Sequence, residues 1–248
     1  MRRTVVLAVL FVLLLISCQK EIHFEGDPSR RCVGCSYLPL CDSSVFTYVD
    51  SANTIDTLRG TVRIGTDTTI AGQRYARVTG FAAFPNGLVY NCSGGDYKTL
   101  LYLSDFGLNA DSLEAQLLQL VQLPIPLPPG VLNLPSSFRN SFLKTNVPVN
   151  GNWVDTIYSL NFPPLLSVFA GLKYTIREKG VSKTLFQRTY ANVIHVQGET
   201  QFTSTLGAIP LPSLKLDYYF SENVGIIQTQ IRRNDTLTRD TKLYQYRL

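Results

Sequence analysis

The chain has 248 residues, a formal net charge of +5 at pH 7 and 45% hydrophobic residues, which suffices for one large or two small domains with packed cores. Lys and Arg form no long run, and this scattered distribution argues against a nucleic-acid partner. With 13 Tyr, 13 Phe and a single Met, alongside many Thr and Val, the composition favours β-sheet over helix.

The first eighteen residues have the pattern of an export signal. Arg2 and Arg3 supply positive charge, residues 5–16 form an unbroken apolar run, and Ser17 precedes Cys18. An apolar run of this length fits a signal-peptide core and is shorter than the ~20 residues of a spanning helix. Residues 15–18 resemble the lipobox of bacterial lipoproteins, which implies that residues 1–17 are removed and that Cys18 carries the lipid. The alternative is an ordinary secretory signal in which Cys18 is incidental.

A lipid on Cys18 would make the membrane the first partner of this chain. Two or more acyl chains, at about 0.8 kcal/mol per buried CH₂, anchor a domain stably to a bilayer. The polar residues 18–36 then form a flexible tether, and residues 37–248 form a β-rich domain. Gln19 is not the aspartate that favours inner-membrane retention of such lipoproteins. We therefore expect an outer-membrane location, on the periplasmic or the cell-surface face.

Four further cysteines follow, namely Cys32, Cys35, Cys41 and Cys92. An even number in an exported protein predicts two disulfides, and the sequence leaves all three connectivities open. The alternatives are free or partly paired thiols, a redox pair at Cys32 and Cys35, or a zinc site of four thiolates. The surrounding loop residues argue against the redox pair, and an oxidising compartment argues against the zinc site. We therefore predict no metal and no cofactor.

Strands and tight turns alternate through most of the chain. Alternating polar and apolar residues predict strands over 44–50, 57–64, 68–70, 74–84, 88–91 and 97–103. In the second half they predict strands over 152–161, 172–179, 182–197, 200–206, 214–221, 225–232 and 236–247, with turns at 178–180, 223–225 and 234–235. The prediction is an all-β, mainly antiparallel fold: a β-sandwich or a strongly curved sheet.

Residues 106–149 interrupt this pattern. A capping-box motif begins at Asp111, and Leu113, Leu117 and Leu120 follow at helical spacing, so we predict one inserted amphipathic helix before a Pro-rich segment. Residues 72–78 resemble residues 187–193. This similarity suggests two related β units, 37–105 and 150–248, although antiparallel strands can also reuse Tyr, Val and Arg by chance.

Three phrases, residues 37–41, 67–75 and 218–227, together with the lipobox, resemble a broad class of uncharacterised Bacteroidota envelope lipoproteins. This resemblance implies an envelope location and a β architecture. It implies no particular reaction, ligand or partner.

The sequence offers little support for catalysis. His23 and His195 are the only histidines, and a lone histidine on a strand usually serves structure. No nucleophile elbow, phosphate loop or dinucleotide motif is present. Carboxylates such as Asp155 and Asp217 could pair in a hydrolase, but nothing in the sequence selects them. We therefore predict a non-enzymatic envelope protein with a binding or structural role, and rank an envelope hydrolase third.

Three uncharged, proline-containing stretches, residues 123–135, 162–172 and 206–214, read as loops that must bury against something. They either cap the β core or line the mouth of a site for an apolar ligand. In the second case the pocket candidates are Trp153, Phe162, Leu166 and Phe169. Docking on an envelope protein, as a surface interaction or adhesion module, is the second functional hypothesis.

Overall fold

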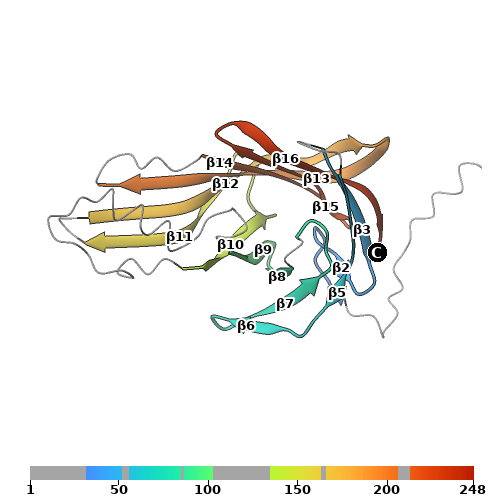
Figure 1. Cartoon of the computed structure of the whole chain (residues 1–248), viewed down its shortest axis with the longest axis horizontal. Helices are drawn as coiled ribbons and strands as arrows, with labels where there is room; N and C mark the ends of the chain where they lie inside the picture. The colour runs from blue at the N-terminus through green and yellow to red at the C-terminus, as the bar shows by residue number, and fades with distance from the viewer. Residues whose placement is uncertain (1–31, 52–55, 85–86, 103–134, 163–165, 206–212) are drawn as a thin grey trace, which may run out of the picture. The chain divides into compact units, whose positions relative to one another are not determined.

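The computed structural model describes residues 32–51, 56–84, 87–102, 135–162, 166–205 and 213–248 (Figure 1). The chain divides into two compact units, residues 1–30 and 31–248, and all described residues belong to the second unit. The predicted signal peptide, Cys18 and the predicted helix near Asp111 lie outside the described residues. Within the described ranges, no helix has the length and hydrophobicity needed to cross a membrane.

All regular elements of the described residues are strands, and every strand pairing is antiparallel. The strands are β1 (Cys32–Val33), β2 (Leu40–Cys41), β3 (Val45–Asp50), β4 (Asp56–Thr61), β5 (Arg63–Ile64), β6 (Thr68–Ile70), β7 (Gln73–Thr79), β8 (Leu88–Ser93), β9 (Asp96–Tyr102), β10 (Ser137–Lys144), β11 (Asn152–Phe162), β12 (Leu166–Leu185), β13 (Arg188–Ser204), β14 (Leu214–Ser221), β15 (Gly225–Arg233) and β16 (Thr236–Arg247). The predicted all-β, antiparallel fold class is confirmed.

The larger sheet has eight strands in the order β11-β12-β13-β14-β15-β16-β3-β4. Strands β11 to β16 follow one another along the chain as a meander. The β3–β4 hairpin then adds to this meander through pairing of β16 with β3, in which Tyr246 lies opposite Phe46. The first long strands of the domain and its last strand are therefore neighbours in one sheet.

The smaller sheet has the order β10-β9-β8-β7-β5, with β6 pairing to β7. The chain enters this sheet at Val62, which is fully buried between β4 and β5 and donates its N–H to the Ser44 carbonyl. The strand predicted over residues 57–64 is therefore two strands in two sheets. After β10, residues 145–151 return the chain to the larger sheet at β11.

Large aromatic side chains pack between the two sheets. Phe142 on β10 packs against Phe220 on β14, with ring centroids 5.7 Å apart. Tyr48 on β3 is fully buried, and its hydroxyl donates to the Ile226 carbonyl at 2.8 Å. One hydrophobic cluster contains buried residues of both sheets. The two sheets therefore share a single core, as in a β-sandwich.

The two sheets do not coincide with the suggested units 37–105 and 150–248. Strands β3 and β4 belong to the larger sheet with β11–β16, and β10 belongs to the smaller sheet with β5–β9. The physical reason is the long-range pairing of β3 with β16, which no local pattern signals.

The longest hairpin, β12–β13, turns at a different place from the one predicted. Gly180, with φ of 73°, lies inside β12 beside a change of register, and the chain continues extended to Leu185. The turn itself consists of Phe186 and Gln187, which both have positive φ. The predicted loop over residues 162–172 also differs, since Phe162 ends β11 and residues 166–172 belong to β12.

Candidate functional site

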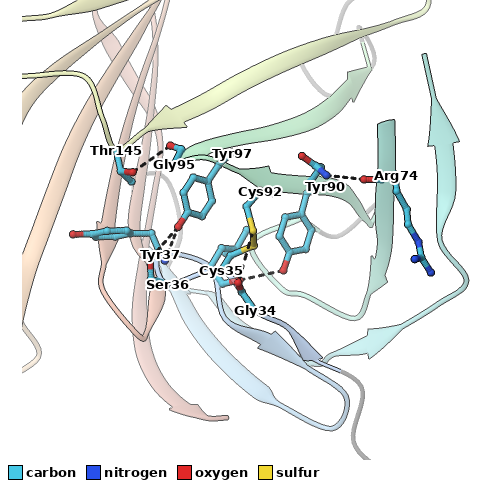
Figure 2. The surroundings of a disulfide bond; sticks show 12 residues. Gly34, Cys35, Ser36, Tyr37, Arg74, Tyr90, Cys92, Gly95, Tyr97 and Thr145 are labelled. Carbon is cyan, nitrogen blue, oxygen red and sulfur yellow. Dashed lines mark hydrogen bonds between the residues drawn. A yellow bond between two sulfur atoms is a disulfide. The ribbon is translucent and has the colours of Figure 1, made fainter. Parts of the chain in front are cut away.

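Two disulfides fasten the start of the described chain to the β domain. Cys32 is bonded to Cys41 across the β1–β2 ladder, and Cys35 is bonded to Cys92 on β8 of the smaller sheet. The Cys35–Cys92 bond bridges residues 57 positions apart in sequence (Figure 2). Cys32 and Cys35 fall within the tether predicted over residues 18–36, so the last part of that segment is covalently linked to the folded core.

Hydrogen bonds hold the same segment against both sheets. The Tyr97 hydroxyl, from β9, accepts the Tyr37 N–H at 3.1 Å and lies 3.2 Å from Ser36 Oγ (Figure 2). The Tyr90 hydroxyl, from β8, donates to the Leu38 carbonyl at 3.1 Å. The Asn223 N–H, from the β14–β15 turn, donates to the Ser36 carbonyl at 2.6 Å. We call residues 32–41 the N-terminal clamp, because covalent and polar contacts both fix them.

A second cluster of polar side chains crosses β13, β14 and β15 of the larger sheet. Asp217 is almost fully buried, and its carboxylate accepts hydrogen bonds from Gln197 at 3.1 Å and from Arg232. His195 Nε2 lies 2.8 Å from the same carboxylate, and the His195 ring stacks on Tyr219 with centroids 4.2 Å apart. A histidine–aspartate pair of this kind is a common part of catalytic sites.

The contacts of Asp217 satisfy its charge within the network. Burial by itself raises the pKa of Asp217, but the hydrogen bond with His195 and the Arg232 charge bring the pKa below its ordinary value. The carboxylate is therefore ionised, and His195, Gln197 and Arg232 all contact it. A Ser or Cys nucleophile does not occur among the partners given above. The described residues also contain no group of three or more His, Cys, Asp or Glu that could hold a metal.

The four apolar pocket candidates are spread along the β11–β12 hairpin. Trp153 is a buried core residue that stacks on Tyr174, and its Nε1–H donates to the Ser141 carbonyl at 2.7 Å. Phe169 lies five residues before Tyr174 on an uninterrupted stretch of β12, so its side chain points to the opposite face of the sheet. Phe162 and Leu166 pair with each other at the end of the hairpin. The structure thus places Trp153 and Phe169 on different faces.

Trp153 and Asp155 together cover an exposed strand edge. Strand β10 is the last strand of the smaller sheet, and its register shifts between Ser141 and Leu143. There the Ser141 carbonyl accepts from Trp153, and the Ser141 N–H donates to the Asp155 carboxylate at 2.5 Å. Both side chains come from β11, the end strand of the larger sheet. These bonds satisfy backbone groups that an edge strand otherwise leaves unpaired.

Asp155 gives this edge a pH dependence that can be measured. Burial raises the pKa of Asp155 from 3.8 to about 6, against the opposing effects of the Ser141 N–H and the Lys144 charge. The folded state therefore binds its proton more tightly than the unfolded state. The resulting stability is present below pH 4 and is lost as the pH rises through 6.

In Asp155→Asn, the amide oxygen can still accept the Ser141 N–H, but the titration is removed. We expect the free energy of unfolding of the native protein to fall as the pH rises from 4 to 6.5, whereas that of the variant should not show this fall. The difference should be about 1 to 2 kcal/mol after allowance for solvent screening. Urea titrations of both proteins across this pH range measure the difference. Parallel pH profiles would contradict the assigned role of Asp155.

No family model and no curated protein matches this chain. Among solved structures, it is similar to a Bacteroides fragilis protein assigned as exported, with a YmcC-like fold, at 10% identity and a TM-score of 0.38. It is also similar to a Parabacteroides distasonis protein assigned as a lipoprotein, at 13% identity and a TM-score of 0.37. These matches cover 86% and 87% of this chain and all of the other chains. Neither description names a ligand, a partner or a reaction.

Proposed function

We propose that this chain is a lipid-anchored protein of the bacterial cell envelope with a binding or structural role rather than a catalytic one. The observation that carries the proposal is the N-terminal clamp. Both of its disulfides, Cys32–Cys41 and Cys35–Cys92, are of the kind that persists in exported proteins and is rare in the cytosol. They support export independently of the signal-like residues 1–18.

The clamp also fixes how far the domain can move from its lipid. Cys18 and Cys32 are fourteen residues apart, and a fully extended chain of that length spans at most about 50 Å. An anchor on Cys18 therefore keeps the β domain close to one membrane face. This short reach supports a role at the membrane surface or on its immediate neighbours.

The packing of the described core favours action through the outer surface. Tyr48, Tyr90, Tyr174 and Phe142 are almost fully buried and belong to one hydrophobic cluster. Large side chains thus occupy the region between the sheets at these positions. The Asp217 carboxylate likewise contacts three side chains of its own sheet, which supports a structural use of that carboxylate.

Envelope fractionation tests the proposed location. We expect the native chain to sediment with outer membranes on a density gradient and to incorporate a labelled fatty acid. In Cys18→Ala the lipid acceptor is absent, so the labelled fatty acid should be lost and the chain should leave the outer-membrane fraction. Native protein that stays soluble after export would refute the anchor. Protease treatment of intact cells then distinguishes the cell-surface face from the periplasmic face.

A second candidate function is the binding of an apolar ligand. Its support is the uncharged, proline-containing composition of residues 123–135 and 206–214, which lie largely outside the described residues. Native mass spectrometry of the mature chain with added oleate tests this hypothesis directly. A discrete bound mass at low micromolar oleate is expected of a carrier. Its absence, with the chain folded, would leave the surface-binding role as the better account.

A further inference from the structure

The turn between β12 and β13 places an aromatic residue in a strained backbone conformation. Phe186 and Gln187 have φ angles of 48° and 66°. Turns with two such residues favour Asn-Gly, because a bulky side chain is strained in the left-handed region. The Phe186 side chain is 48% exposed, so burial does little to offset the strain. Strain kept at an exposed aromatic residue points to a role beyond folding.

A second exposed ring lies beside Phe186. Tyr244 on β16 is 56% exposed, and the two rings meet edge to face with centroids 5.4 Å apart. We call these two residues the aromatic tip. Their rings form an exposed apolar contact that water covers in the isolated domain.

The two segments that carry the aromatic tip are basic. Residues 181–188 and 242–248 contain four basic side chains and no Asp or Glu. Lys242 forms an ion pair with Asp240 at 2.8 Å, whereas Arg188 and Arg247 are exposed. The Arg188 guanidinium lies 4.4 Å from the Tyr246 ring centre and donates to the Tyr246 hydroxyl at 3.0 Å. The tip thus offers rings and guanidinium groups together.

Strand register places the aromatic tip at the same end of the larger sheet as the N-terminal clamp. Tyr246 lies opposite Phe46, and β3 begins four residues after Cys41. Cys41 is in turn bonded to Cys32, which is the disulfide cysteine nearest to Cys18 in sequence. In Figure 1, the turn of the β12–β13 hairpin and the C-terminal end of β16 lie on the same side of the domain as β3.

We propose that the aromatic tip enters the interfacial layer of the bilayer to which the chain is anchored. Phe186 and Tyr244 lie among the headgroups, and Arg188 and Arg247 contact lipid phosphates. Aromatic rings and long basic side chains favour this layer, where one end of each meets apolar matter and the other meets water. The exposed guanidinium groups of Arg188 and Arg247 complement an anionic lipid surface. This inference rests on the proposed lipid anchor at Cys18.

Tryptophan quenching in proteoliposomes tests the contact. The native chain has one tryptophan, Trp153, which is buried in the core and gives a constant background. Lipidated Phe186→Trp is reconstituted in vesicles of phosphatidylethanolamine and phosphatidylglycerol with brominated acyl chains. We expect the added emission to shift to shorter wavelength and to fall at least twofold relative to unbrominated vesicles. Arg188→Gln in the same background should weaken the quenching.

Val154→Trp is the matched control, because Val154 is 43% exposed and pairs with Lys173, thirteen residues before Phe186 on β12. Its emission should be the same in both kinds of vesicle. Equal quenching of the two reporters, on a chain whose acyl mass is verified, would refute the tip contact and leave the anchor intact. A chain that carries no acyl group would refute both. Phe186→Asn, which suits the turn, should keep or raise the thermal midpoint; a lower midpoint would show that Phe186 serves the fold.

Discussion

The double variant Cys35→Ala/Cys92→Ala is expected to unfold with a free energy about 4 kcal/mol lower than that of the native protein, because the lost crosslink closes a 57-residue loop in the unfolded chain. This disulfide joins the N-terminal clamp to the smaller sheet, and Cys35 is buried, so packing around its side chain is also lost. Urea unfolding under oxidising conditions measures the change. The Cys35–Cys92 disulfide should therefore contribute more to the free energy of unfolding than the Cys32–Cys41 disulfide.

Cys32→Ala/Cys41→Ala is the matched control. Its loop spans only 9 residues, for which the same chain-entropy relation gives about 2.5 kcal/mol. The variant should thus be distinctly more stable than the Cys35–Cys92 variant. Equal losses, or a larger loss for the short loop, would contradict the view that the long-range link is what ties the clamp to the core.

Gly80→Ala is expected to lower the free energy of unfolding by about 3 to 5 kcal/mol, through left-handed backbone strain together with steric overlap. Gly80 has a φ of 70°, and a Cβ atom there would lie 1.9 Å from the Thr61 carbonyl oxygen. The obstacle is backbone, so no side chain can move aside. Residues 60–61 and residue 80 approach each other closely at this point, directly before the chain passes from the larger to the smaller sheet at Val62. Thermal and urea unfolding both report it.

Gly72→Ala separates the two causes. Gly72 has a similar φ of 75°, but nothing lies within 4 Å of the Cβ position. This variant should lose only the conformational part, about 1 kcal/mol. If the two alanine variants were equally stable, the close approach of residues 60–61 and 80 would be wrong.

Local sequence patterns predicted individual strands better than their partners. The bounds of β14 and β16 follow from alternating side chains and from a turn at Asn234 and Asp235, both of which adopt positive φ. The β3–β16 pairing joins segments almost 200 residues apart, which no local pattern reveals. The turn at Phe186 was missed for a different reason. Gly180 carried the stronger turn signal, but β12 accommodates it beside a change of register.

The polar clusters show the same limit. The four disulfide cysteines were visible in the sequence, but their connectivity depends on β8 lying beside the N-terminal segment. His195 and Asp217 were each noted separately. Their contact depends on the register of β13 against β14, which the sequence alone does not reveal. Trp153 is a pocket candidate in the sequence; in the structure it is a core residue whose indole N–H donates to the Ser141 carbonyl at the β10 edge.

The most direct test of the account is the intact mass of the mature chain purified from its native envelope, followed by non-reducing peptide mapping. We predict a chain that starts at an acylated Cys18 and contains peptides linked through Cys32–Cys41 and Cys35–Cys92. A mature protein without fatty acyl groups, or with these four cysteines reduced, would contradict the envelope anchor and the clamp that positions the β domain beside it.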